Sequence, residues 1–454
     1  MTLRHLLAVG ALLLLPATGH AQAARLRVPF TLDTLPNGLT LIVHEDHSVP
    51  IVTTNVWFHV GSGDEKTGRT GFAHLFEHLM FMGSEHAPYP QFDRLLEAAG
   101  ANNNGSTTED RTNYYEAGPS SALRLMLWLE ADRMGWLLPT MDKPKVDLQR
   151  DVVKNERRQS YENQPYGMVA DVLPKLMYPA GHPYSWPVIG SMADLSAASV
   201  DDVKDFFRRY YAPNNATLVV AGDVKPDSVR AIVREYFRDI PRGPAIERPA
   251  PAAFTVRDTA ATLEDRVQLA RLYLNWHTVK NTAADAPALQ VAAYMLAGSR
   301  TSRLTQALVY NGEIATTVQA YHDGKRLDGD FAIVATARPG RALDTLQTVI
   351  DQNLQRHAGE GPTARELDQA RNAIEASFLR SIQTVGGKAD QLNEYYYQTG
   401  NPDGFQDDLD KLRAVSASDI QRVVRTYLQA PRVMVSVVPQ GKQNLAATQR
   451  KVTP

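Results

Sequence analysis

The sequence predicts an α+β protein made of two similar domains that derive from an internal duplication. Its 454 residues are 43% apolar, enough to bury more than one hydrophobic core. The stretch from Ser199 to Gly222 is echoed, about two hundred residues later, by the stretch from Ser416 to Gly441. Each of the two reads as a helix followed by a strand. Such a repeat indicates that one α+β domain occurs twice.

Candidate strands alternate with longer helical stretches along the chain, which supports the mixed composition. Examples of these strands are residues 39–43, 51–60, 216–220 and 271–276. Their periodicity leaves open which strands are neighbours in a sheet.

A proline-rich segment separates the two copies. It contains Ile240-Pro241-Arg242-Gly243-Pro244 and Arg248-Pro249-Ala250-Pro251, and stiff sequences of this kind are typical of domain boundaries. We therefore predict an N-terminal domain over residues 24–247, a C-terminal domain over residues 248–441 and a tail over residues 442–454.

The N-terminus has the features of a cleavable signal peptide over residues 1–23. Arg4 and His5 precede an apolar run from Leu6 to Leu15, and small residues follow in Gly19-His20-Ala21-Gln22-Ala23. The run is too short for a typical membrane span, and no later stretch approaches the required length. We expect an exported protein, periplasmic or secreted, without a membrane span.

Cysteine is absent and the formal net charge is only −2. The absence of cysteine excludes disulfides, thiolate metal ligands and a cysteine nucleophile. The small net charge gives no electrostatic basis for binding nucleic acid. Peptide substrates are compatible with this composition.

Two histidines and a glutamate fall within five residues, in His74-Leu75-Phe76-Glu77-His78. On a helix, residues three and four apart share a face, so His74, Glu77 and His78 can converge while the apolar residues turn into a core. Two neutral imidazoles suit Zn²⁺, and one further protein ligand would leave a position for water, as in catalytic zinc sites. The same residue types on a half-buried helix can also serve packing and hydrogen bonding alone.

Residues on either side of the motif suggest where its helix begins and ends. Thr70 can serve as the N-cap, and Gly83 suits the left-handed position that follows a last helical turn.

The order H-x-x-E-H inverts the better-known H-E-x-x-H and needs a distant acidic ligand. A second helical stretch opens near Asp142 and Pro144 and ends before Pro165. Glu156 lies within it and is the predicted third ligand.

These motifs resemble those of the pitrilysin, insulinase and mitochondrial processing peptidase superfamily of zinc endopeptidases, over nearly the whole mature chain. In that family the third ligand follows in a V-x-x-E context, which Val153-Lys154-Asn155-Glu156 matches. The resemblance implies antiparallel sheets packed with helices. It also implies one zinc ion per chain, bound by His74, His78 and Glu156, with Glu77 as the general base.

A second matching segment includes Gly100-Ala101-Asn102-Asn103-Asn104-Gly105-Ser106-Thr107-Thr108. Its composition alone indicates a polar turn that leads into a strand. The resemblance implies instead the edge strand beside the zinc, where an extended peptide can join the sheet. The predicted substrate contacts are Asn104, Gly105, Ser106 and Thr107.

One departure from the family's pattern lies close to the predicted ligands. Gln149 stands two helical turns before Glu156, where many members carry a second glutamate. Zinc does not require that residue as a ligand, but its loss can alter the support of the site or the charge around it.

A second departure lies in the C-terminal half. Active members use an arginine and a tyrosine, seven residues apart, to hold and polarise the substrate carbonyl. Aligning Ser302-Arg303-Leu304 with the family's S-R-L places Val309 and Thr316 at those positions. Arg303 and Tyr310 have the same spacing, but the S-R-L arginine is expected to be structural.

The half-length members of this family work as pairs of subunits, one with zinc and the other with the arginine and tyrosine. We therefore expect a zinc endopeptidase subunit that hydrolyses peptides or unfolded proteins, as a heterodimer with a homologous subunit that carries the Arg/Tyr pair. The alternatives are a non-catalytic peptide-binding or scaffold subunit, and a self-sufficient homodimeric peptidase.

Overall fold

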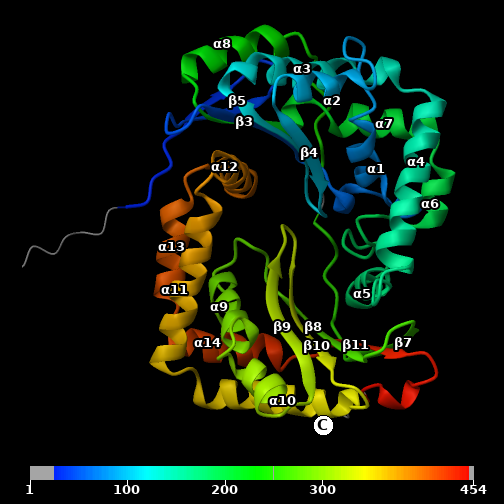
Figure 1. Cartoon of the computed structure of the whole chain (residues 1–454), viewed down its shortest axis with the longest axis vertical. Coiled ribbons are helices and arrows are strands. Elements are labelled where there is room, and N and C mark those ends of the chain that lie inside the picture. The colour runs from blue at the N-terminus through cyan, green and yellow to red at the C-terminus, as the bar shows by residue number, and fades with distance from the viewer. Residues whose placement is uncertain (1–24, 249, 449–454) are drawn as a thin grey trace, which may run out of the picture.

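The computed structural model describes residues 25–248 and 250–448, which form two halves with one sheet each (Figure 1). The predicted signal peptide lies outside the described residues. Among the described residues, no helix combines the length and the apolar composition needed to cross a membrane.

The first sheet has six strands in the order β1-β2-β6-β3-β5-β4. Its strands are antiparallel except for the parallel pair β2 and β6. Their bounds are β1 (Thr31–Thr34), β2 (Thr40–Glu45), β3 (Ile51–Phe58), β4 (Asn102–Thr107), β5 (Thr112–Pro119) and β6 (Ala216–Gly222).

The second sheet has five strands in the order β7-β11-β8-β10-β9, with the parallel pair β7 and β11. Without β1, the first sheet has the same order, strand for strand, which is the result expected from a duplicated domain. The bounds are β7 (Thr259–Asp265), β8 (Arg271–Thr278), β9 (Ala315–Gly324), β10 (Gly329–Ala337) and β11 (Val433–Pro439). The predicted strands at 39–43, 51–60, 216–220 and 271–276 are thus β2, β3, β6 and β8.

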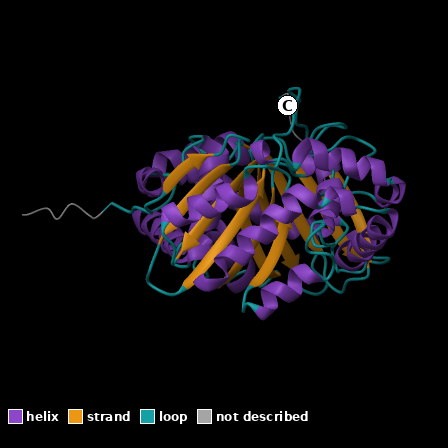
Figure 2. Ribbon diagram, turned by 90° about the horizontal axis from the view of Figure 1, so that it is seen from above, coloured by secondary structure: helices purple, strands orange, loops and turns teal. Residues whose placement is uncertain are grey.

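Helices pack across both sheets, as the view from above shows (Figure 2). Those of the first half are α1 (Phe72–Leu79), α2 (Gln91–Ala98), α3 (Leu123–Trp136), α4 (Lys143–Arg157), α5 (Val169–Met177), α6 (Met192–Ala197), α7 (Val200–Tyr210) and α8 (Pro226–Phe237). Those of the second half are α9 (Ala286–Ala297), α10 (Leu343–Glu360), α11 (Ala364–Ser381), α12 (Val385–Thr399), α13 (Phe405–Ala414) and α14 (Ala417–Val423).

The predicted repeat corresponds to a helix and a strand in each half. Ser199 caps α7 and Ser416 caps α14, each in a capping box with the aspartate three residues later. β6 follows α7, and β11 follows α14 after a short π-helical turn. Both copies therefore begin their helix by the same local interactions, although the helices end differently.

The two halves exchange one helix each. α12, from the second half, packs against β6 and β3 of the first sheet, and α5, from the first half, packs against β11 (Figure 1). The contacts are apolar: Leu392 of α12 lies in one cluster with Ile42 and Val219, and Met177 of α5 lies in another with Val435. Each sheet is therefore covered on one face by its own half and on the other face by the other half.

Polar contacts reinforce this exchange. The buried Asn393 of α12 donates from Nδ2 to the carbonyl oxygen of Asn55 in β3, at 3.0 Å. Asp110, in the loop between β4 and β5, accepts from Tyr184 Oη at 2.6 Å and from the backbone N–H of Arg326 at 2.9 Å. Arg326 belongs to the turn between β9 and β10, so the ends of the two hairpins are joined.

The predicted domain boundary near Arg248 falls in the segment between α8 and β7. Arg248 itself is paired with Asp64 of the first half, with 2.8 Å between Nε and Oδ1. The first residues of the predicted tail lie against the second core, where Ala447 is buried.

A buried ionic cluster lies beneath the first sheet. Arg133 of α3 donates from Nε to Glu130 at 2.9 Å and from Nη2 to Glu116 of β5 at 3.1 Å. Its guanidinium also lies over the ring of Tyr114, 4.5 Å from the ring centroid. Burial raises the pKa of Glu116 well above its usual range, Glu130 adds to this effect, and Arg133 opposes it. The positive charge of Arg133 offsets the free-energy cost of burying the carboxyl groups of Glu116 and Glu130.

We expect Arg133→Met to lower the free energy of unfolding by about 3–5 kcal/mol, because it leaves Glu116 and Glu130 buried without a cation. The matched control is Arg124→Met in the same helix, whose ion pair with Glu235 is more than half exposed and should contribute little to stability. Urea unfolding followed by circular dichroism measures both. Equal small losses in the two variants would contradict a structural role for the cluster.

Candidate metal centre

α1 carries the histidine motif as predicted. Leu75, Phe76 and Leu79 are buried in the first core. His74 and His78 lie on another face of the helix, with their ring centroids 4.8 Å apart. The 3.6-residue period thus separates the apolar residues from the polar ones within two turns.

The start of α1 differs from the prediction. Its N-cap is Gly71, with φ 88°, and not Thr70. The hydroxyl of Thr70 donates to Asp194 instead, at 2.5 Å. The orphan N–H groups of Gly71 and Ala73 donate to the carboxylate of Glu65, at 2.9 and 2.8 Å.

Glu65 was not identified from the sequence because it lies several residues before the helix, in an irregular segment. It is 8% exposed, and burial raises the pKa of its carboxyl group, while the backbone N–H groups oppose that shift. A carboxylate at this position also complements the positive end of the helix dipole.

The end of α1 also comes earlier than predicted. The helix ends at Leu79 with Met80 as C-cap, so Gly83 lies beyond it, in the loop that follows. The φ of Gly83 is +79°, and a Cβ atom there would lie 2.1 Å from the backbone nitrogen of Tyr89. Glycine is therefore required by the loop rather than by the helix end.

α4 supplies the third predicted ligand. It begins at its N-cap Asp142, which accepts from the N–H of Lys145, and it continues into a π-helical turn over Arg158–Glu162. Glu156 lies in its last turn, and α4 packs along α1.

His74, His78 and Glu156 converge, although 78 residues separate His78 from Glu156 in the chain. Glu156 Oε2 lies 3.3 Å from His78 Nε2 and 3.7 Å from His74 Nε2. Ligands about 2.0–2.1 Å from a tetrahedral zinc ion lie about 3.3–3.5 Å from one another. The His78 separation lies in this range and the His74 separation is slightly longer, and two nitrogens and one oxygen are donors that zinc binds, so the three residues could hold a zinc ion.

The protonation states also suit a cation. Burial lowers the pKa of His74 to about 4, so its imidazole is neutral at pH 7. The hydrogen bond with His78 lowers the pKa of Glu156, so its carboxylate is ionised. Neutral imidazole and ionised carboxylate are the forms that bind metals.

Glu77 lies beside these three residues and faces the edge strand. Its Oε2 accepts from Thr107 Oγ1 at 2.6 Å. Burial raises the pKa of Glu77, and the Thr107 hydrogen bond opposes this shift. A Cβ atom on Gly105 would lie 3.2 Å from Glu77 Cγ, so glycine lets β4 come this close to α1.

β4 is the edge strand of the first sheet, as the resemblance implied. Asn104 is exposed, and its Oδ1 accepts from the N–H of Gly105 at 2.8 Å. Ser106 donates to Asn113 at 2.6 Å and is engaged within the sheet. Of the four predicted contacts, Gly105 and Thr107 are the two that lie against Glu77.

Arg111 supports this edge and was not identified from the sequence. Its Nη1 donates to the carbonyl oxygen of Ser106 at 3.0 Å and to Asn113 at 3.1 Å. Its guanidinium also lies 4.9 Å from the centroid of a ring of Trp57. A single arginine after the hairpin turn gives no sequence signal for this role.

Among the described residues, no hydrogen bond links the Gln149 side chain to the three converging residues. Its Nε2 lies 2.8 Å from the sulfur atom of Met82, to which it donates. The residue is therefore engaged by a neighbouring loop, in the place where many family members carry a second glutamate.

The C-terminal residues that the alignment singled out are structural. Val309 packs against the second core, and Thr316 donates to the carbonyl oxygen of Thr336 at 3.2 Å. Arg303 forms two hydrogen bonds with Glu366, at 2.7 and 2.9 Å, so the expectation of a structural role for it is confirmed. Tyr310 accepts from Arg300.

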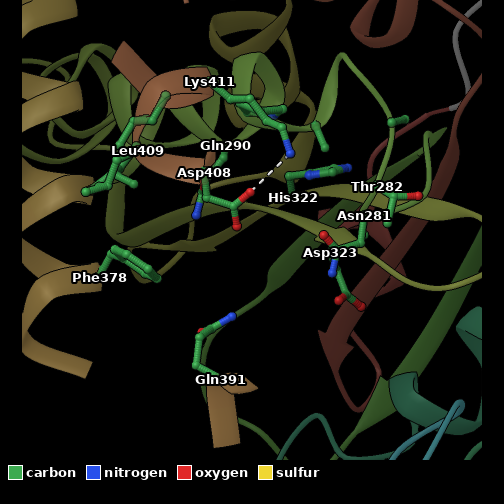
Figure 3. Close-up of a pocket in the computed structure, with 16 residues that line it drawn as sticks. Asn281, Thr282, Gln290, His322, Asp323, Phe378, Gln391, Asp408, Leu409 and Lys411 are labelled. Atoms are coloured by element: carbon green, nitrogen blue, oxygen red, sulfur yellow. Dashed lines mark hydrogen bonds and ion pairs between the residues drawn. The ribbon is translucent and has the colours of Figure 1, made fainter. Parts of the chain in front are cut away.

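A cavity of 360 Å³ lies in the second half (Figure 3). His322, Asp323 and Gln391 line it, and Asp408 and Lys411 form an ion pair at its wall. None of the predicted site residues lines it.

Comparisons with known proteins bear on both halves. The profile described as "Insulinase (Peptidase family M16)" matches residues 40–185, and the profile described as "Peptidase M16 inactive domain" matches residues 197–374. The zinc protease PqqE of Helicobacter pylori is 28% identical over 437 residues, which cover 94% of this chain and 97% of that protein.

Two further similarities extend over most of the chain. The probable mitochondrial-processing peptidase subunit beta of Arabidopsis thaliana is 24% identical, over 89% of this chain and 77% of that protein. The crystal structure of a protease from Helicobacter pylori superposes with a TM-score of 0.85 and 26% identity, over 90% of this chain and 99% of that one.

We expect Glu65→Ala to lower the free energy of unfolding by about 1–3 kcal/mol, because two buried N–H groups at the start of α1 lose their acceptor. Amide hydrogen exchange should become faster at Gly71 and Ala73 in particular. The control is Glu85→Ala, which replaces an exposed glutamate and should leave exchange in α1 unchanged. Unchanged exchange in Glu65→Ala would show that the carboxylate does not hold the helix start.

Proposed function

The chain belongs to the pitrilysin and insulinase superfamily of peptidases, family M16, and we propose that it is a zinc-dependent endopeptidase subunit. In this proposal one zinc ion binds to each chain, held by His74, His78 and Glu156. The substrates are peptides or unfolded proteins, which the exported chain meets in the periplasm or outside the cell.

The convergence of His74, His78 and Glu156 on one point, with Glu77 beside them, carries this proposal. Three protein ligands leave a fourth position open, as catalytic zinc sites do. The edge strand β4 lies directly alongside, so a peptide can be held next to the open position.

The chemistry divides between the ion and the protein. Zinc held by His74, His78 and Glu156 would supply an activated water molecule and a Lewis acid for the carbonyl group. Glu77 takes the proton from the attacking water and returns it to the leaving amine. Thr107 holds the Glu77 carboxylate in place. The unpaired backbone groups of β4 orient the extended substrate.

We further propose that a homologous partner subunit completes the site. Stabilising the negative charge on the substrate carbonyl calls for hydrogen-bond donors. The aligned positions hold Val309, whose side chain cannot donate, and Thr316, whose hydroxyl is engaged by Thr336. The relative from Arabidopsis thaliana is itself named as a subunit.

We expect Glu77→Gln to retain one zinc ion per chain and to reduce hydrolysis of a denatured protein by at least about 10²-fold, because the general base is lost. His78→Ala should lose the metal, and a chelator should silence the unmodified chain until zinc is restored. Elemental analysis and a quenched-peptide assay provide the two readouts. Glu97→Gln, which changes an exposed glutamate of α2, is the control.

These outcomes also separate the alternatives. A chain that binds no zinc would be a peptide-binding or scaffold subunit. A chain that binds zinc but loses nothing in Glu77→Gln would need another base, and the assignment of Glu77 would be wrong.

We expect a homologous chain with R-x6-Y and no H-x-x-E-H to co-purify with this protein from the periplasmic extract of its host. Mixing the two purified chains should raise hydrolysis by about 10²-fold or more, which is the effect of one donor that stabilises an oxyanion. Full activity of this chain alone, with no gain from any partner, would favour the self-sufficient homodimer.

A further inference from the structure

Arg157 directly follows the candidate ligand Glu156, and it is buried, with 6% of the residue exposed. Adjacent helical residues point about 100° apart, so Arg157 lies on a different side of α4 from Glu156. The next residue, Arg158, is exposed and donates to Asn155 of α4. The regular α-helix ends at Arg157 and continues as a π-helical turn, so the turn that carries Glu156 has α-helical backbone on one side only.

The guanidinium of Arg157 joins α4 to two other segments. Nη2 donates to Asp171 Oδ1 in the first turn of α5, at 2.7 Å, and Nη1 donates to the carbonyl oxygen of Gly190, at 2.9 Å. Its Cζ atom lies over the ring of Tyr161, 5.4 Å from the ring centroid. Burial raises the pKa of Asp171, but the hydrogen bonds from Lys175 and Arg157 lower it overall, so an ionised carboxylate faces the guanidinium.

Gly190 lies directly against the start of α1. Its φ is +71°, and a Cβ atom there would lie 2.4 Å from the Cα atom of Gly71, the N-cap of α1. The next residue, Ser191, donates its backbone N–H to Thr70 Oγ1 at 3.0 Å. Because no side chain separates the two glycines, the backbone that accepts from Arg157 touches the backbone from which α1 begins.

A continuous path of contacts therefore leads from one candidate ligand to the other two. Glu156 is joined to Arg157 by a peptide bond, and Arg157 binds Gly190. Gly190 in turn packs on the N-cap of the helix that carries His74 and His78. All of these contacts are between protein groups, so they can hold the three candidate ligands in place before an ion binds.

We propose that Arg157 is a positioning residue for the candidate metal centre. By binding Gly190 and Asp171 at once, it fixes the last turn of α4 and with it the place of Glu156 relative to α1. Arginine suits this role because the nitrogens of its planar fork donate in fixed directions, whereas lysine offers a single ammonium group. This inference rests on the proposed function, in which the three converging residues bind zinc.

The test compares the full chain with Arg157→Lys, which keeps the charge and removes the fork. Competition with a chromophoric chelator measures the affinity for zinc. The variant should bind zinc about tenfold more weakly or worse, as is usual when the support of a metal ligand is lost. Cobalt in place of zinc gives a second readout, because its visible absorption depends on the geometry of its ligands. This absorption should change in Arg157→Lys.

Arg303→Lys is the matched control, because Arg303 makes the same kind of contacts in the half without the candidate ligands. Arg303 donates to the carboxylate of Glu366 at 2.7 Å and to the carbonyl oxygen of Gly361 at 2.9 Å. Its replacement should leave the zinc affinity and the cobalt spectrum unchanged.

A second variant addresses the same contact from α5. Asp171→Asn weakens the ion pair with Arg157 and should also lower the zinc affinity and change the cobalt spectrum. Circular dichroism checks that each variant folds, and Asp171→Asn carries the test if Arg157→Lys does not fold.

Unchanged zinc affinity and an unchanged cobalt spectrum in the folded variants would overturn the proposal, and so would an equal loss of affinity in Arg303→Lys. An unmodified chain that binds neither ion would refute the zinc site and this inference with it. A chain that binds zinc, loses affinity in Arg157→Lys and hydrolyses no peptide would refute the endopeptidase and leave the role of Arg157 standing.

Discussion

The central strands of each sheet are buried on both faces, but each half of the chain supplies helices for only one of these faces. The second face is covered by a helix from the other half, α12 on the first sheet and α5 on the second. Burying these faces is favourable only if the two halves close on each other. The closure joins the ends of the β4–β5 and β9–β10 hairpins at Asp110. The edge strand beside the candidate metal centre therefore has its position set by the packing of the entire chain.

Carboxylates serve different purposes in this structure because their surroundings differ. Glu65 is buried and accepts from the backbone at the start of α1, so it fixes the helix that carries both histidines. Glu156 is more exposed, and its hydrogen bond with His78 keeps it ionised. Glu77 is held by Thr107, and burial raises its affinity for a proton. Glu109 lines a cavity between the two halves, and burial raises the pKa of its carboxyl group, while Lys325 opposes this shift. One type of side chain thus holds a helix start, converges with two histidines, accepts a hydrogen bond from a threonine and lines a cavity.

The second half keeps the architecture of the first without the residues of its candidate metal centre. Arg303 and Glu366 retain a structural ion pair, while Val309 and Thr316 are taken up by packing and by a backbone hydrogen bond. The same half nevertheless supplies one wall of a cavity between the two halves, through Asn275 and Tyr321. In a duplicated protein, one copy can thus lack the candidate metal ligands while its sheet still lines a cavity shared with the other copy.

The sequence by itself determined the features that depend on residues close together in the chain, namely helix faces and helix caps. The spacing of His74, Glu77 and His78 places them on one side of a helix, and the serine caps repeated in both halves mark the duplicated helix and strand. Glu156 could be chosen as well, because the inverted motif lacks an acidic ligand and the second helix offers one in the expected context. Only the tertiary structure decided that Glu65 rather than Thr70 holds the start of α1. It also decided that α5 and α12 each pack on the sheet of the other half, and that Glu109 lines a cavity. The physical reason is that these features are contacts between segments far apart in the chain, whose pairing depends on how the sheets close and not on any local repeat.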